Sequence, residues 1–350
     1  MAEQEFRING ASIAPGTRAT MDLPAGKLYT HAPMAIPVHV VRGKRDGPRL
    51  FVCAAIHGDE INGVEIIRRL LKLSTLRHLR GTLLAIPIVN VHGFINHSRY
   101  LPDRRDLNRS FPGSEQGSLA ARIAHLFMEE IIRKSTHGID IHTGAIHRGN
   151  LPQIRANLED PETERLARAF SVPVIISSML RDGSLREAAA EAGVPTLLYE
   201  SGEALRFDEL SIRAGVKGII NVMRALNMLP NSRGAGKTAI KPVVAHASSW
   251  VRAGESGILR AMVPLGGRVE KGTLLGVIAD PFGATEINVV SPFSGIVIGR
   301  SNLPLANEGD ALFHIARFND LGDAEARMDV FHEQHAPEPV TLPNPESPII

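Results

Sequence analysis

The sequence predicts an α/β protein in which helices cover both faces of a central sheet, followed by a small all-β module. Between residues 46 and 230, apolar strands alternate with amphipathic helices, which is the pattern of a sheet covered by helices. From residue 238 to 318, short apolar runs are separated by Gly and Pro turns, which is typical of β structure. With 350 residues, 43% of them hydrophobic, the chain can bury a large core.

The first predicted elements lie in an N-terminal β segment, residues 1–45, and directly after it. Residues 36–43 are strand-like, and we expect Arg-Asp-Gly-Pro at 45–48 to break this strand. The continuous apolar run 50–56 predicts a strand that is buried on both faces. Apolar residues at helical spacing in 61–73 then predict the first helix.

The same alternation continues to the end of the α/β domain. Further strands are predicted at 82–89, 138–142, 172–176 and 195–200, and further helices at 119–133, 184–192 and 213–226. Residues 230–237 have the composition of a linker to the β module. The tail, residues 319–350, is first acidic and then rich in proline, and we expect it to be poorly ordered.

The β module contains a weak internal repeat. Ser-Gly-Ile-Leu at 256–259 and Ser-Gly-Ile-Val at 294–297 open two similar halves, which suggests a β-sandwich resembling the barrel-sandwich fold of biotinyl and lipoyl carrier domains. A carrier domain needs a modifiable lysine, but Gly283 stands at that position and no lysine occurs between residues 280 and 290. We therefore interpret the module as a lid or as a contact between subunits of a homo-oligomer.

Composition and charge exclude several classes of partner. The formal charge is +2 and acidic and basic residues are interspersed, so we expect no nucleic-acid partner. No run of about 18 apolar residues predicts a membrane span, and residues 1–7 lack the apolar core of a signal peptide. We therefore expect a cytoplasmic protein. The single cysteine, Cys53, and the single tryptophan, Trp250, are interpreted as packing residues.

The first candidate site residues follow the buried strand 50–56 directly. His57 and Glu60 stand three residues apart, between this strand and the next helix. An imidazole nitrogen and a carboxylate oxygen are both zinc ligands, so this spacing can direct the two side chains at one ion. The pattern is weak evidence by itself, because a surface histidine beside an acid at a helix N-terminus has the same spacing.

Two further strand ends carry candidate residues. His142 ends the strand 138–142 and would complete a His-Glu-His set that leaves one position open for water. Asp140 is a candidate partner that orients a ligand. Glu200 ends the strand 195–200 and is a candidate base for water and acid for a leaving amine. Because open α/β sheets build their sites at strand ends, we expect these residues to meet at one zinc ion.

An arginine-rich loop, residues 99–113, connects predicted elements of the same domain. Its sequence is Arg-Tyr-Leu-Pro-Asp-Arg-Arg-Asp-Leu-Asn-Arg-Ser-Phe-Pro-Gly. Such a loop is usually solvated, but arginine forks can bind a carboxylate at two points. Beside a metal, these arginines would bind an anionic substrate and polarise a carbonyl.

Four motifs in this order resemble the succinylglutamate desuccinylase/aspartoacylase family. They are His-Gly-Asp-Glu at 57–60, Asp-Leu-Asn-Arg-Ser-Phe-Pro-Gly at 106–113, Asp-Ile-His-Thr-Gly at 140–144 and Tyr-Glu-Ser-Gly at 199–202. The resemblance covers about residues 45 to 318. It implies a zinc-carboxypeptidase-like mixed sheet flanked by helices, and one zinc ion per chain.

The resemblance also implies a role for each matching residue. It implies zinc ligands at His57, Glu60 and His142, a general base and acid at Glu200, and a grip on the substrate carboxylate by Asn108 and Arg109. It further implies that Arg99 polarises the scissile carbonyl, with Arg104 and Arg105 as alternatives. The tyrosine that this family takes from its C-terminal domain has no counterpart, because no tyrosine follows Tyr199.

The predicted activity is zinc-dependent hydrolysis of an amide bond in an N-acyl amino acid, a small-molecule substrate. This is deacylase chemistry on a carbon–nitrogen bond other than a peptide bond. One alternative is a metallocarboxypeptidase that acts on a short peptide. Another is a non-catalytic zinc- or ligand-binding protein, although such a protein needs no base like Glu200. No Gly-x-Ser-x-Gly motif indicates a serine hydrolase.

Overall fold

The structure, a computed structural model, describes residues 6–231 and 240–335. The strands before residue 231 are β1 (Phe6–Ile8), β2 (Ala11–Ile13), β3 (Arg18–Lys27), β4 (Pro33–Arg42), β5 (Arg45–Ala54), β6 (Arg80–Ile86), β7 (His137–Gly144), β8 (Arg148–Ala156), β9 (Val174–Ser177) and β10 (Thr196–Glu203). The helices are α1 (Asn62–Lys72), α2 (Val91–Ile95), α3 (Leu119–Glu130), α4 (Pro161–Phe170), α5 (Leu185–Glu191), α6 (Glu209–Ala225) and α7 (Leu321–His335). Short 3-10 turns occupy Ser74–His78, Leu107–Arg109 and Ile132–Lys134.

The strands after residue 240 belong to the C-terminal β module. They are β11 (Val243–Ala245), β12 (Ala247–Arg252), β13 (Gly257–Ala261), β14 (Arg268–Val269), β15 (Leu274–Ala279), β16 (Glu286–Val290), β17 (Gly295–Ser301), β18 (Leu305–Ala306) and β19 (Ala311–Arg317). The predicted linker lies mostly in residues 232–239, outside the described residues. Among the described helices, none is long and apolar enough to cross a membrane.

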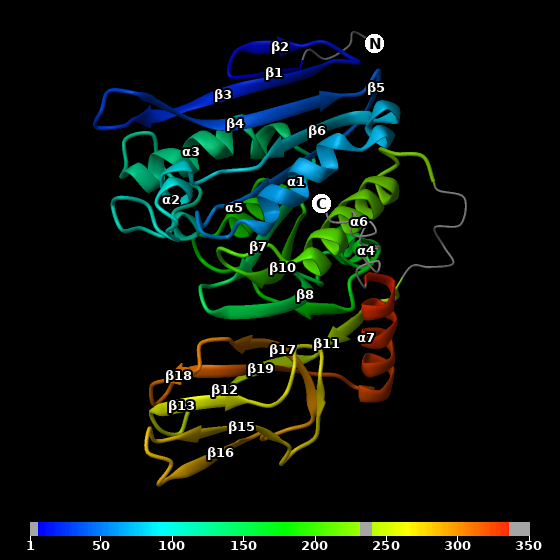
Figure 1. Ribbon diagram of the computed structural model, residues 1–350. Coiled ribbons are helices and arrows are strands. Elements are labelled where there is room, and N and C mark those ends of the chain that lie inside the picture. Colours follow the sequence, from blue (N-terminus) through cyan, green and yellow to red (C-terminus); the bar gives the residue numbers. More distant parts are fainter. Residues whose placement is uncertain (1–5, 232–239, 336–350) are drawn as a thin grey trace, which may run out of the picture.

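One mixed sheet extends through the whole molecule, as Figure 1 shows. Within the described residues it has 13 strands, and its main path runs β12–β19–β17–β8–β10–β7–β5–β6–β4–β3. Strands β6, β5, β7 and β10 are parallel to their neighbours in this series, whereas β8 is antiparallel to β10. The predicted mixed α/β sheet is therefore confirmed.

Helices cover both faces of this sheet because strand residues alternate between two cores. In β5, the side chains of Leu50 and Val52 belong to one core, and those of Phe51 and Cys53 to the other. The first core includes buried residues of α1, α4 and α6, and the second includes buried residues of α3 and α5. The polar faces of these helices remain at the surface.

The C-terminal module shares its larger sheet with the α/β domain. Strand β17 pairs antiparallel with β8, so that β17, β19 and β12 continue the main sheet. Strands β16, β15, β13 and β18 form a separate 4-stranded antiparallel sheet that packs on them. Apart from β11, which pairs parallel with β9, the module is thus built of antiparallel strands, and its likeness to a barrel-sandwich stays a prediction.

The predicted break at residues 45–48 is wrong. The chain turns two residues earlier, at Gly43 and Lys44, and β5 already begins at Arg45. A register shift between Arg45 and Arg49 in the pairing of β5 with β6 accommodates Asp-Gly-Pro within the strand. Irregular pairing of this kind is where a strand tolerates proline.

The expectation of a poorly ordered tail is wrong for residues 321–335, which form α7. Ala324, Met328, Phe331 and His335 are buried at helical spacing along this helix. Phe331 is fully buried in the core that also contains residues of α6, and Figure 1 shows α7 standing beside the junction between the domain and the module. The proline-rich residues 336–350 lie outside the described part of the chain.

Candidate active site

Three adjacent parallel strands bring the predicted site residues together. Strand β7 lies between β5 and β10, so the carboxyl ends of all three strands meet at one edge of the sheet. His57 follows β5, and His142 and Glu200 lie near the ends of β7 and β10. His142 and Glu200 are direct partners in the pairing of these two strands.

The turn after β5 directs the His-Gly-Asp-Glu motif into the site. Ala55 has a φ of 53°, in the left-handed region that few non-glycine residues adopt. Gly58 passes so close to α2 that a Cβ atom would lie 2.0 Å from the carbonyl carbon of Gly93. Only glycine fits at the second position of the motif, because any larger side chain would overlap the main chain of α2.

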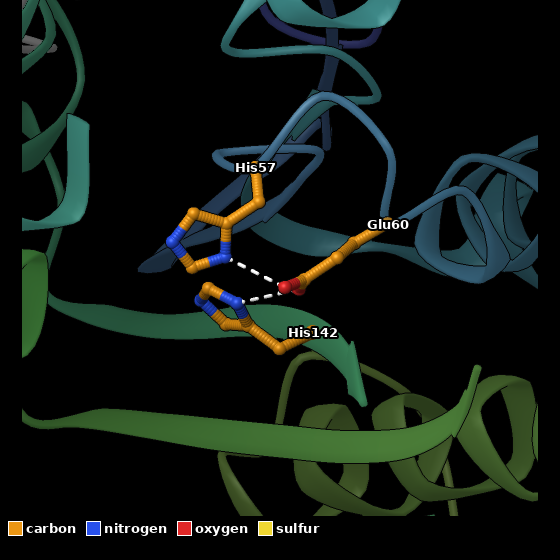
Figure 2. Close-up of side chains that lie close together, drawn as sticks. All are labelled: His57, Glu60 and His142. Atoms are coloured by element: carbon orange, nitrogen blue, oxygen red, sulfur yellow. Dashed lines mark hydrogen bonds and ion pairs between the residues drawn. The ribbon is translucent and has the colours of Figure 1, made fainter. Parts of the chain in front are cut away.

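His57, Glu60 and His142 form a buried group that could hold a metal ion. The two imidazoles point at the Glu60 carboxylate from either side, as Figure 2 shows. His57 Nδ1 lies 2.7 Å from Glu60 Oε1, and His142 Nδ1 lies 2.8 Å from Glu60 Oε2. The ligand atoms of the three residues lie within 4.8 Å of one another.

The outer nitrogen of each histidine has a carboxylate partner. His57 Nε2 lies 3.1 Å from Asp106 Oδ1, and His142 Nε2 lies 2.8 Å from Asp140 Oδ2. These contacts orient both rings with Nδ1 toward the centre, which is how metal-binding histidines are usually held. The donor set, two imidazoles and one carboxylate with outer carboxylate partners, fits a zinc ion.

Electrostatics keep the central carboxylate ionised. Burial would raise the pKa of Glu60, but His57 and His142 outweigh this effect and hold that pKa well below its usual value. Burial would lower the pKa of His142, whereas Asp140 and Glu60 raise it well above its usual value. The site thus concentrates negative charge around two imidazoles, which favours a cation.

Replacing Asp140 with asparagine is expected to weaken metal binding without removing a ligand. The substitution removes the charge that orients His142, and such partners typically change metal affinity by about 10–100-fold. Competition titration with a zinc-chelating dye would measure the change in the dissociation constant. Asp329→Asn, at an exposed position of α7, is the control, and equal zinc affinity in both variants would refute a role for Asp140.

Glu200 faces the same cavity, and residues of β8 hold its two oxygens. Asn150 Nδ2 donates a hydrogen bond to Glu200 Oε1 at 2.7 Å. Arg155 Nε lies 2.6 Å from Glu200 Oε2, as an ion pair without hydrogen-bond alignment. Asn150 and Arg155 are not among the predicted site residues, because no strand is predicted from the sequence at residues 148–156.

Arg99 lies next to the candidate metal ligands, unlike its two alternatives. Its Nη1 is 3.3 Å from Glu60 Oε1 and its Nη2 is 3.0 Å from Asp106 Oδ2. Arg104 and Arg105 are exposed and do not line the cavity. Among the three arginines, the geometry therefore favours Arg99 for contact with a substrate carbonyl.

Asn108 and Arg109 line the same cavity. Asn108 is buried, and its Oδ1 accepts a hydrogen bond from the Leu185 N–H at 2.9 Å. This contact uses the acceptor end of the amide and leaves the two Nδ2 donors for a ligand. Arg109 donates from Nη1 to the main-chain carbonyl of Asn108, so its guanidinium group is held against the turn that carries Asn108.

The cavity has a volume of about 340 Å³, and arginines outnumber acids along its wall. The arginines are Arg99, Arg109, Arg148, Arg155, Arg181 and Arg186, and the acids are Glu60 and Glu200. Trp250 of β12 also lines it, in addition to the packing role that the sequence predicts for this tryptophan. Its ring stacks on His314 with centroids 4.7 Å apart, and Arg148 lies over the ring at 5.1 Å.

Comparison with known proteins places the chain among related hydrolases. The N-alpha-acetyl-L-2,4-diaminobutyric acid deacetylase of Halomonas elongata is 26% identical over 299 residues, which are 80% of this chain and 85% of that protein. A succinylglutamate desuccinylase/aspartoacylase from Rhodobacter sphaeroides has a TM-score of 0.76 at 22% identity, over 86% of this chain and 96% of that chain. The product-bound ectoine utilization protein EutE (DoeB) from Ruegeria pomeroyi has a TM-score of 0.75 at 24% identity, over 86% and 94%.

The fold and these matches identify the class of this protein, a hydrolase built on a mixed α/β sheet. The relative from Halomonas elongata is a deacetylase. Within this class, the chain belongs to the succinylglutamate desuccinylase/aspartoacylase family, whose catalytic domain matches residues 46–226. The family resemblance inferred from the four motifs is therefore confirmed.

Proposed function

We propose that this protein is a zinc-dependent deacylase that hydrolyses the amide bond of an N-acyl amino acid. The observation that carries the proposal is the composition of one cavity. A His-Glu-His group, the carboxylate of Glu200 and the paired donors of Asn108 and Arg109 all face it. Together they supply a cation site, a base and a carboxylate anchor, which are the parts that amide hydrolysis needs.

We assign one zinc ion per chain to His57, Glu60 and His142. Bound zinc polarises a carbonyl oxygen and lowers the pKa of a water molecule toward about 7. Asp106 and Asp140 hold the two imidazoles in the orientation that presents Nδ1. The main-chain N–H of Thr143 donates to Glu60 Oε2 at 3.0 Å and fixes the carboxylate as well.

Glu200 acts as the general base and then as the general acid. It accepts a proton from the attacking water and returns it to the nitrogen of the leaving amine. Contacts from Asn150 and Arg155 to its two oxygens limit rotation of the carboxylate. Both proton transfers therefore use a group whose direction is set before substrate binds.

Arginine and asparagine side chains orient the substrate. Arg109 and the Nδ2 donors of Asn108 bind the α-carboxylate of the amino acid. Arg99 donates to the carbonyl oxygen of the scissile amide, where negative charge develops during attack. A donor at such a position contributes about 3–4 kcal/mol to the transition state.

Arg186 is the reason to expect a second carboxylate on the substrate. This arginine is only 6% exposed, lines the cavity, and takes part in none of the ion pairs among the described residues. Burial lowers its pKa to about 10, so it is still charged at neutral pH. Its contacts are the Arg155 carbonyl at 3.4 Å and Ser178 Oγ at 3.2 Å. The charges of Asp140 and Glu200 also act on Arg186, but neither carboxylate forms an ion pair with it. A buried cation that has no direct ion pair favours an anionic ligand.

We therefore expect a preference for substrates that carry two carboxylates. A screen would compare N-acetyl and N-succinyl derivatives of aspartate, glutamate and alanine with N-acetyl-2,4-diaminobutyrate and with dipeptides. We expect kcat/KM to be about 10–100-fold higher for dianions than for the diaminobutyrate compound, since one charged hydrogen bond contributes about 1.5–3 kcal/mol. Arg186→Gln should remove this preference, and Arg206→Gln, at an exposed position, should not.

The outcomes of this screen separate the alternatives. Faster hydrolysis of dipeptides than of every acyl amino acid would indicate a metallocarboxypeptidase. Stoichiometric zinc without any hydrolysis across the panel would indicate a binding protein. A preference for the diaminobutyrate compound would refute the expectation that the substrate carries a second carboxylate, but it would not refute the deacylase activity.

A further inference from the structure

A row of paired residues runs from the C-terminal module into the candidate active site. Trp250 pairs with His314, His314 with Gly299, Gly299 with Asn150, and Asn150 with Gly202. The row thus crosses β12, β19, β17, β8 and β10 in turn. Directly opposed residues of antiparallel strands place their side chains on one face of the sheet. This face is the one that presents Trp250 and Asn150 to the cavity.

Asn150 is the member of this row that contacts Glu200. Its side chain is 6% exposed and donates from Nδ2 to Glu200 Oε1 at 2.7 Å. The neutral amide holds one carboxylate oxygen by a hydrogen bond, and the cation Arg155 lies at the other oxygen. Asn150 is therefore a contact that restrains Glu200 without adding charge.

Gly299 of the module provides the space that Asn150 occupies. A Cβ atom at Gly299 would lie 2.7 Å from Asn150 Oδ1 and 3.3 Å from His314 Cβ. The first distance is too short for two such atoms, and the His314 Cβ is held by its strand. An alanine at position 299 would therefore push the Asn150 amide out of its present position.

We propose that Asn150 is a positioning residue for Glu200, and that Gly299 of the C-terminal module sets the position of Asn150. The inference rests on the proposed role of Glu200 as general base. It assigns the module a function in catalysis: β17 completes the support of the base. The module is then part of the active site and cannot be removed without loss of turnover.

A double-mutant cycle on kcat tests this chain of contacts. Asn150→Ala should lower kcat about 10-fold or more with KM changed less than twofold, because a hydrogen bond to a charged group is lost. Asn150→Asp, which replaces the donor with an acceptor, should lower kcat at least as far. Gly299→Ala should also lower kcat, but it should have no further effect in the Asn150→Ala background, since both act through one group.

The matched control for position 299 is Gly254→Ala in the same module. A Cβ atom there would meet no atom within 4 Å, so kcat should stay at the wild-type value. Additive losses in the Gly299→Ala and Asn150→Ala double variant would overturn the proposal. So would a rise in KM in place of the fall in kcat, because that would indicate damage to substrate binding.

Crystal structures of the zinc-loaded variants provide a test that does not depend on activity. In Asn150→Ala and Gly299→Ala, the Glu200 carboxylate should leave the position that it has in the wild-type protein. If it stays in place in both variants, the proposal is wrong whatever the kinetics are. If it moves, but Glu200→Gln remains active, the positioning is correct and the proposed general base is not.

Discussion

Glu200→Gln is expected to retain bound zinc and to lose turnover by about 10²–10⁴-fold, the usual contribution of a general base. Glutamine has the shape of glutamate and can still accept the Asn150 hydrogen bond through its Oε1. It cannot take a proton from water or deliver one to the leaving nitrogen. The residue is not a member of the His-Glu-His group, so metal content should not change.

Two measurements on the same preparation check this expectation. Elemental analysis gives the zinc content, and steady-state kinetics with the best acyl amino acid gives kcat. Glu191→Gln is the control, because Glu191 is exposed at the end of α5. Turnover within tenfold of wild type in Glu200→Gln would remove Glu200 from the mechanism. Loss of zinc together with turnover would instead indicate that Glu200 supports the metal site.

The strand ends that form the site could be predicted from the sequence, because the strands that lead to them are buried. The strands β5, β7 and β10 lie in the middle of the sheet and are covered on both faces. Their buried stretches, residues 50–54 of β5, 138–141 of β7 and 197–199 of β10, are therefore largely apolar, and the polar residues that follow these stretches stand out. Since parallel strands align their carboxyl ends, His57, His142 and Glu200 had to approach one another once the strand assignment was correct.

Strand β8 was not predicted, because the site itself disturbs its pattern. Asn150 and Gln153 are buried although they are polar, and Arg155 is paired with Glu200. Polar residues that face a cavity or support a base interrupt the apolar run by which a buried strand is usually identified. The contacts of Glu200 depend on this strand, so the support of the base could not be inferred from sequence.

The role of the C-terminal module could not be predicted, because it depends on a pairing between strands that are far apart in the sequence. The spacing of apolar residues within a strand does not indicate such a partner. The short strands with Gly and Pro turns predicted a β module, but nothing in them indicated that β17 pairs with β8. This pairing brings Trp250 to the cavity wall. Helix α7 was missed for a similar reason, because its buried residues become recognisable only beside α6.

Glu60→Gln is expected to weaken zinc binding strongly and, at limiting metal, to lose turnover together with the zinc. Glu60 is 2% exposed and its carboxylate contacts His57, His142, Arg99 and the Thr143 N–H. Glutamine preserves the volume but removes the only anionic ligand of the group. Zinc binding of about 10–16 kcal/mol is shared among a few ligands, so the loss of one should raise the dissociation constant on the order of 10³-fold.

The contrast between the two glutamates separates the metal site from the base. Glu60→Gln should lose zinc and activity together, whereas Glu200→Gln should lose activity alone. Excess zinc should restore part of the turnover of Glu60→Gln, because its Glu200 still lies at the cavity, and it should not restore Glu200→Gln. Full zinc occupancy in Glu60→Gln at equal affinity would show that the cation is held elsewhere. In that case the buried contacts of Glu60 with two histidines would be structural, and the assignment of the metal to this group would be wrong.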